Sequence, residues 1–234
     1  MNDKKTFDFW YAVNNTEVVK MPSQHLETFG ATVFNYHLIS ELMDTANRSR
    51  VREGRMKARK PQIIAPRDFS QNVLEGFGAE AEQYVNWLRE HEDSIRILQY
   101  GYNLKKEQFS EHFVSESADV VAERVKTEGR IADDPLSAVL IGVDEPWDVC
   151  LIKLFLEVTV RSVQRNVSDM GKRRMFDNTG GLPRALHDEL EKDFLDASRN
   201  PALVKTLGAK LQRLGVFKQY EDRFFSLLDR KSQH

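Results

Sequence analysis

Residues 47–61 read "NRSRVREGRMKARKP", and this stretch sets the first expectation about the fold. It holds seven Lys or Arg side chains and one Glu. As a helix it would bury almost nothing, because its only apolar residues are Val51, Met56 and Ala58. We therefore expect an extended strand with a bend or bulge at Gly54. We also expect it at the edge of a sheet, where Lys and Arg oppose pairing with other chains.

The residues before this stretch also show strand patterns. Residues 6–22, "TFDFWYAVNNTEVVKMP", alternate in polarity around the pair Asn14 and Asn15, which predicts a β-hairpin. Residues 31–43, "ATVFNYHLISELM", favour a further strand, although their carboxyl half could equally be helical. As a strand, this run would place four apolar side chains on one face: Phe34, Tyr36, Leu38 and Leu42.

Residues 62–116 combine both patterns. "PQII" continues the basic strand, and a pair of short helices is then predicted near residues 68–93, with glycines between them. Residues 95–115, "IRILQYGYNLKKEQFSEHFVS", predict a second hairpin with its turn near Lys105.

After residue 116 the pattern is mostly helical. Residues 144–167, "DEPWDVCLIKLFLEVTVRSVQRNV", are apolar enough to form a central buried helix. Three more helices are predicted, in residues 183–197, 200–215 and 216–231, the second of them capped by Asn200. Residues 138–143 fit either a helix or a strand, and a strand would create a parallel βαβ unit. The middle of the core is expected to contain Trp147, Leu151, Leu154, Phe155 and Val158.

Together these patterns predict an α+β fold. An amino-terminal antiparallel sheet of about four to six strands, with an inserted helical pair, precedes a mainly helical carboxyl-terminal half. The expected division is a sheet-rich part, residues 1–116, and a helical part, residues 117–234, packed as a single compact domain.

Composition places the chain among soluble globular proteins, with 41% hydrophobic and 30% charged residues. Its most apolar run, residues 149–160, is interrupted by Lys153 and Glu157 and is shorter than the roughly 20 residues that span a bilayer. No targeting pattern is recognised, so the expected location is cytoplasmic, without a membrane partner. The single cysteine, Cys150, excludes an intramolecular disulfide and a cysteine-rich zinc site.

Charge distribution suggests the leading functional hypothesis. The chain has a net charge of −2, yet its basic stretch carries +6 in isolation. We therefore expect a non-catalytic binding protein that presents this stretch to a polyanion, with RNA slightly ahead of DNA. Exposed aromatic rings, such as Trp10, Tyr11 or Tyr100, should then lie beside it for stacking. The predicted binding residues are Arg48, Arg50, Arg52, Arg55, Lys57, Arg59 and Lys60.

Three alternatives remain open. The basic strand could be neutralised by the protein's own acidic surface, or it could meet an acidic partner, including a second copy of the chain, in a scaffold protein. The protein could instead be an enzyme that acts on a phosphorylated small molecule. A secondary anion site is predicted where basic residues precede two glycines and a helix: Lys172, Arg173, Arg174, Gly180, Gly181 and Arg184.

The histidines give no clear catalytic or metal motif. His37 with Glu41 and His187 with Glu191 are close in sequence, but neither pair matches a known metal spacing. No nucleophile motif or dinucleotide-binding motif is present. The sequence therefore predicts no metal and no cofactor, and it favours a non-enzymatic role.

Overall fold

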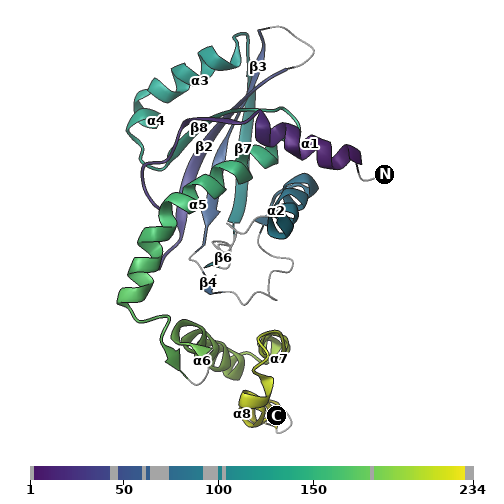
Figure 1. The fold of residues 1–234 in the computed structure, drawn as a ribbon, viewed down its shortest axis with the longest axis vertical. Coiled ribbons are helices and arrows are strands. Elements are labelled where there is room, and N and C mark those ends of the chain that lie inside the picture. Colours follow the sequence, from purple (N-terminus) through teal and green to yellow (C-terminus); the bar gives the residue numbers. More distant parts are fainter. Residues whose placement is uncertain are drawn as a thin grey trace. The chain divides into compact units, whose positions relative to one another are not determined.

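The computed structural model describes residues 3–42, 47–59, 62–63, 74–91, 100–101, 104–179 and 182–229. The chain forms two compact units, one of residues 1–62 with 71–166, the other of residues 63–70 with 167–234. The expected division at residue 116 differs from this boundary, because residues 117–166 contribute a strand and a long helix to the first unit. Figure 1 shows the elements of both units.

The first unit is built on a six-stranded sheet. Its strands, in spatial order, are β1 (Glu17–Lys20), β8 (Ser137–Gly142), β2 (Thr32–Glu41), β3 (Ser49–Ala58), β7 (Leu104–Val114) and β5 (Leu74–Glu75). Two-stranded ladders also form between β4 (Gln62–Ile63) and β6 (Tyr100–Gly101), and between β9 (Asn178–Thr179) and β10 (Leu182–Pro183). The predicted α+β class and the number of strands are confirmed.

The sheet is mixed, so the predicted antiparallel sheet is wrong. β8 pairs with β2 in parallel, and β5 pairs with β7 in parallel. The reason for the first parallel pair is a crossover: after β7 the chain forms α3 (Ala118–Thr127) and α4 (Gly129–Asp133) and returns beyond β2 in the direction of β7. Of the two alternatives for residues 138–143, the strand is therefore the one adopted.

The basic stretch is a strand, as predicted, but it is not an edge strand. β3 pairs with β2 along its whole length and with β7 on its other side. The ladder between β3 and β7 is irregular between Gly54 and Met56, but the extra residue lies in β7, where the three steps from Lys106 to Phe109 face two steps of β3. β3 itself pairs with β2 without interruption, so the bulge expected in β3 at Gly54 is not observed. Because both neighbours are present, the backbone groups on both sides of β3 can be hydrogen-bonded within the sheet.

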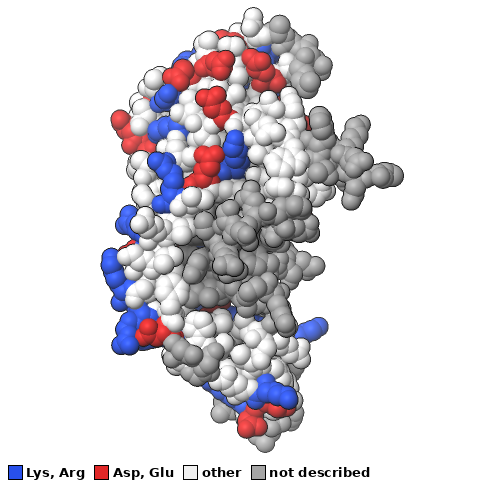
Figure 2. All heavy atoms as spheres, viewed as in Figure 1, with Lys and Arg blue, Asp and Glu red and all other residues white. Residues whose placement is uncertain are grey.

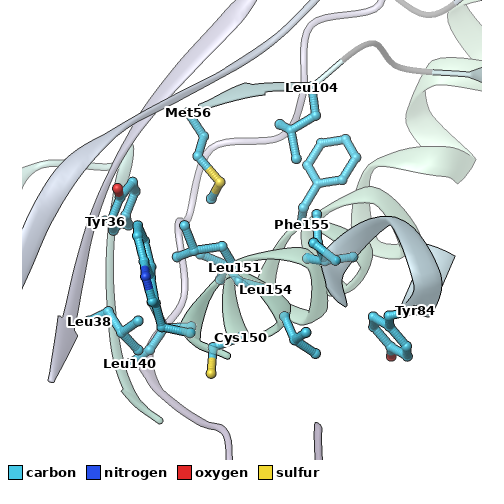
Figure 3. Close-up of a cluster of buried hydrophobic side chains, with 14 of the residues drawn as sticks. Tyr36, Leu38, Met56, Tyr84, Leu104, Leu140, Cys150, Leu151, Leu154 and Phe155 are labelled. Carbon is cyan, nitrogen blue, oxygen red and sulfur yellow. The ribbon is translucent and has the colours of Figure 1, made fainter. Parts of the chain in front are cut away.

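One face of the sheet carries the main hydrophobic core. It is packed against α5 (Trp147–Lys172), α1 (Asp3–Asn14) and α2 (Ala79–His91). Figure 3 shows side chains from the strands, including Leu38, Met56 and Leu140, facing Leu151 and Leu154 of α5. The five side chains predicted for the middle of the core are all buried in this cluster. The predicted central helix is thus confirmed.

The opposite face is covered by helices only in part. Val121 and Val125 of α3 pack against Ile39, Val51 and Val139 of the sheet. Figure 1 shows α3 and α4 beside the upper end of the sheet. Further along the strands this face becomes polar, and it borders a pocket that is described below.

The predicted amino-terminal hairpin is wrong in its first half. Residues 3–14 form α1, while β1 confirms the predicted second strand. Six of the seven residues from Phe7 to Val13 are apolar. Their pattern fits the two-residue period of a strand and the 3.6-residue period of a helix equally well, so it does not distinguish the two. Packing decides for the helix: the Phe9 ring lies 5.6 Å from that of Tyr84, and Trp10 lies 4.4 Å from Trp87.

Two further expectations concern residues 68–115. Of the predicted helical pair, α2 is observed, and residues 74–75 form β5. The rest of the first helix lies outside the described residues. The turn predicted near Lys105 is wrong, because Lys105 lies within β7 and pairs with Lys57 of β3.

The second unit consists mainly of helices, as predicted. After β10 come α6 (Arg184–Arg199), η2 (Pro201–Leu203), α7 (Val204–Arg213), η3 (Phe217–Tyr220) and α8 (Glu221–Asp229). Leu190, Phe194 and Leu211 lie in their shared core. The side chain of Asn200 accepts a hydrogen bond from the backbone N–H of Ala202 at 3.1 Å, which confirms the predicted cap.

Gly54 supplies a prediction about stability. A Cβ at this position would lie 2.6 Å from Tyr36 Oη and 2.9 Å from Phe109 Cβ, so Gly54→Ala should lower the free energy of unfolding by about 1–3 kcal/mol. Gly129→Ala is the control, because a Cβ there meets nothing within 4 Å. Urea unfolding followed by tryptophan fluorescence measures both, since Trp10, Trp87 and Trp147 all lie in the first unit. Equal stability of the two variants would contradict the packing described here.

Candidate functional site

Strand alternation divides the basic stretch between the two faces of the sheet. Successive side chains of a strand point to opposite faces. Arg52 lies beside Trp147 of α5, whereas its neighbour Val51 packs with α3. Arg50 and Arg52 therefore belong to the α5 face, and Arg55 and Lys57 to the opposite face. The predicted seven-residue site is not one continuous surface.

On the α5 face the arginines are neutralised by the protein's own carboxylates. Arg52 is only 1% exposed, and its Nη1 lies 3.0 Å from Asp144 Oδ1. Its Nε lies 3.4 Å from Glu111 Oε2, and its Nη2 lies 3.6 Å from Glu145 Oε1. Arg50 shares Asp144 at 3.3 Å. For these two residues, the alternative of internal neutralisation applies.

Trp147 links this charge cluster to a second ion pair. The Arg52 guanidinium lies 5.0 Å and the Lys106 ammonium 4.2 Å from the centre of its ring. Lys106 is paired with Asp148 at 2.6 Å, and Asp148 also accepts a hydrogen bond from the backbone N–H of Gly78 at 2.7 Å. The first turn of α5 is thus held against the sheet by the cation–π contacts of Trp147 and by the ion pair between Asp148 and Lys106.

Tyr36 is buried next to this network. Burial raises the pKa of its hydroxyl well above the ordinary value, the Asp148 carboxylate raises it further, and the Arg52 guanidinium opposes the shift. Among the described residues, neither Tyr36 Oη nor Arg52 Nε has a hydrogen-bond partner. Tyr36 therefore remains a neutral phenol, and we assign the network a structural role.

Arg48 is exposed and lies at a large pocket of about 1070 Å³. Its guanidinium is 5.1 Å and that of Arg50 is 5.0 Å from the centre of the Phe113 ring, which is 46% exposed. Tyr11, one of the rings expected beside the basic stretch, also lines this pocket. Phe113 was not among the expected rings. The carboxylates in the lining outnumber these two arginines: Glu41, Asp119, Asp144 and Glu145. This pocket is therefore unfavourable for a polyanion.

The polar face opposite α5 borders a second pocket, of about 500 Å³. Arg55 is 63% exposed in its side chain and is paired with Glu107 at 3.1 Å. Lys57 and Arg130 have no ion-pair or hydrogen-bond partner among the described residues. At the far end of this face, Glu75 pairs with both Arg59 and Lys105. Lys60 lies outside the described residues.

A histidine and a carboxylate face each other in the same pocket. His37 of β2 and Glu53 of β3 are directly paired across the sheet, with 3.2 Å between His37 Nδ1 and Glu53 Oε1. Ser110 of β7 is the cross-strand partner of Glu53 on the other side. Sequence reasoning coupled His37 with Glu41 instead, because it lacked the register of β2 and β3.

The predicted secondary anion site has local acidic partners. Lys172 is paired with Asp169 at 3.4 Å, Arg174 with Asp177 at 2.7 Å and Arg184 with Asp188 at 3.8 Å, while Arg173 also makes a contact. Gly180 and Gly181 lie outside the described residues. Most of the positive charge expected at this site is thus balanced within the second unit.

We searched the described part of the chain for metal-binding clusters and for an accessible thiol. Among the described residues, no three His, Cys, Asp or Glu side chains are grouped closely enough to hold a metal ion. Cys150 is buried, as expected, and burial raises the pKa of its thiol. In the same part of the chain, none of the helices has the length and apolarity needed to cross a bilayer.

Comparisons with models of protein families, with curated proteins and with solved structures yield no match for this chain.

The buried arginine gives the second prediction. Arg52→Met should lower the free energy of unfolding by about 1–3 kcal/mol, because it removes the buried guanidinium that pairs with Asp144 and Glu111, while Asp144 keeps Arg50 at 3.3 Å. Arg55→Met, which removes an exposed ion pair, should change it by less than about 1 kcal/mol. Urea unfolding followed by circular dichroism measures both changes. Similar stabilities would show that the network does not hold α5 in place.

Proposed function

We propose that the protein binds a polyanion, RNA ahead of DNA, on the face of the sheet opposite α5. The surface consists of Arg55 and Lys57 of β3 and Arg130 of α4, with Arg59 and Lys105 at its margin. We call this surface the open face. The main support is that strand alternation directs Arg55 and Lys57 of β3 away from the carboxylates that neutralise Arg50 and Arg52, and that Arg130 lines the pocket on the same side.

The local charge balance favours the open face over the larger pocket. The open face carries the five cations just named and four carboxylates: Glu53, Glu75, Glu107 and Asp134. The Asp134 carboxylate is already satisfied by hydrogen bonds from Ser137, Leu136 and Asn35. By contrast, the pocket beside Arg48 has two more carboxylates than cations. A phosphate chain is repelled less by the open face, where two cations also lack partners among the described residues.

In the upper half of the face drawn in Figure 2, charge is not gathered into one basic patch. Figure 2 shows acidic and basic side chains interspersed over the upper half of the face that it displays. A binding mode that uses a few specific cations therefore fits better than a wide electrostatic surface. About three phosphate contacts to a single strand correspond to a slope of log K against log salt near −2.

Preference for RNA follows from the polar groups between the cations. Asn35 lines the same pocket as Arg55 and Arg130, and its Nδ2 donates to Asp134, which leaves its amide oxygen as an acceptor. Such an acceptor can receive a hydrogen bond from a ribose 2′-hydroxyl, which DNA lacks.

Charge reversal on the two faces of the sheet tests this proposal. The double substitution Lys57→Glu with Arg130→Glu should weaken the binding of a fluorescein-labelled single-stranded RNA at least about tenfold and flatten the salt dependence, because two phosphate contacts are lost. Arg48→Glu, on the other side of the sheet, is the matched control and should bind as the wild type does. Fluorescence anisotropy at several salt concentrations measures both.

Unchanged affinity in the double variant, or an equal loss in the control, would refute the assignment to the open face. Light scattering on the same samples examines the scaffold alternative, to which the exposed Phe109 and Phe113 of β7 lend support. That alternative predicts a salt-sensitive dimer without RNA affinity.

A further inference from the structure

We propose that His37 is a catalytic general base, oriented by Glu53, and that the protein cleaves single-stranded RNA held on the open face. The reaction is transfer of the phosphodiester to the adjacent 2′-hydroxyl. This inference depends on the proposed function, because the RNA must first be bound beside the pocket that contains both residues.

The register of the sheet places the two side chains together. His37 and Glu53 are opposite residues of antiparallel strands, so their Cβ atoms share one face. The 3.2 Å between Nδ1 and Oε1 lets Glu53 accept the Nδ1–H hydrogen bond. In the neutral imidazole with this tautomer, Nε2 carries a lone pair and can accept a proton. Glu53 is therefore a positioning residue.

Packing restricts the imidazole ring while leaving it accessible to a ligand. The His37 side chain is 13% exposed, compared with 39% for Glu53, and both line the pocket. A largely buried ring has few alternative rotamers, so its orientation is preorganised. The pocket that His37 and Glu53 line has a volume of about 500 Å³, which is large enough for one nucleotide.

Cations that can stabilise the transition state lie in the same pocket. Arg55 is two residues from Glu53 on the same face of β3, and Arg130 lines the pocket from α4. Their guanidinium groups can bind the phosphoryl oxygens, on which negative charge increases as the new bond forms. Glu107 is paired with Arg55 at 3.1 Å and would be displaced by the phosphate.

The proposed step balances without a redox partner. His37 Nε2 takes the proton of the ribose 2′-hydroxyl while the 2′-oxygen forms a bond to phosphorus and the bond from phosphorus to the 5′-oxygen breaks. Water protonates the leaving 5′-oxygen, and the resulting hydroxide takes the proton from His37. The products are a 2′,3′-cyclic phosphate and a 5′-hydroxyl. Only one base is needed for activation, since the nucleophile is already adjacent to the phosphate.

The ordinary alternative is a cross-strand pair with a purely structural role. Such pairs contribute roughly 0.2–1 kcal/mol to the stability of a sheet. A structural pair would affect folding and would leave no product to detect. The two readings are separated by measuring turnover, binding and stability on the same variants.

The test uses a DNA oligonucleotide with one central ribonucleotide, incubated with the full chain in the presence of EDTA. Mass spectrometry should detect a 2′,3′-cyclic phosphate at that nucleotide alone. His37→Gln should lower kcat about 10²-fold or more, because the base is lost. Glu53→Gln should lower kcat with little change in KM, and Glu53→Asp should restore part of the rate. His112→Gln, on the same face of β7, is the matched control and should cleave at the wild-type rate.

Binding is measured separately by the anisotropy of the fluorescein-labelled single-stranded RNA, which keeps the ribose 2′-hydroxyl that the open face is proposed to recognise. Wild-type protein that binds this RNA but yields no cyclic phosphate overturns the catalytic inference and leaves the proposed function intact. Absence of binding overturns the proposed function itself. Cleavage that persists unchanged in His37→Gln, purified identically and equally stable, also refutes the role of His37.

Discussion

The arrangement of this protein depends on one constraint: β3, its most basic segment, is an internal strand. Neighbouring strands on both sides pair with its backbone, and its side chains project alternately from the two faces of the sheet. On the α5 face they meet a closed environment, where Arg52 must have carboxylates to offset its desolvation. On the opposite face they meet a pocket that helices leave uncovered. The side chains of a single cationic sequence thus lie in two different environments.

The ion pairs around the buried Arg52 bring together segments that are distant in the sequence. Asp144 and Glu145 come from the turn before α5, and Glu111 comes from β7, yet all three converge on one guanidinium. Removing Arg52 takes the buried guanidinium away from all three carboxylates, whereas an exposed pair tolerates the loss of one member. This dependence makes the network selective for one packing of α5 against the sheet. Such a network is consistent with a structural role.

Much of the fold follows from local sequence, and most of the candidate site does not. The apolar run around Leu151 and the cap at Asn200 specify their helices directly. The basic stretch has no apolar face that a helix could bury, and this indicates that β3 is a strand. Whether β3 lies at the edge depends on which strands pair with it, and periodicity carries no such information. The pairing of His37 with Glu53 can be predicted only if the register of β2 and β3 is known. The neutralisation of Arg52 depends on Asp144, which is about 90 residues away along the chain.

Amide hydrogen exchange along β3 distinguishes an internal strand from an edge strand, because every backbone N–H of an internal strand has a neighbour while half of those in an edge strand do not. The account predicts slow exchange at consecutive amides from Arg50 to Gly54 and again from Met56 to Ala58, on either side of the irregularity in the ladder. Rapid exchange at alternate amides would place β3 at an edge. That result would contradict the division of its cations between a closed and an open face.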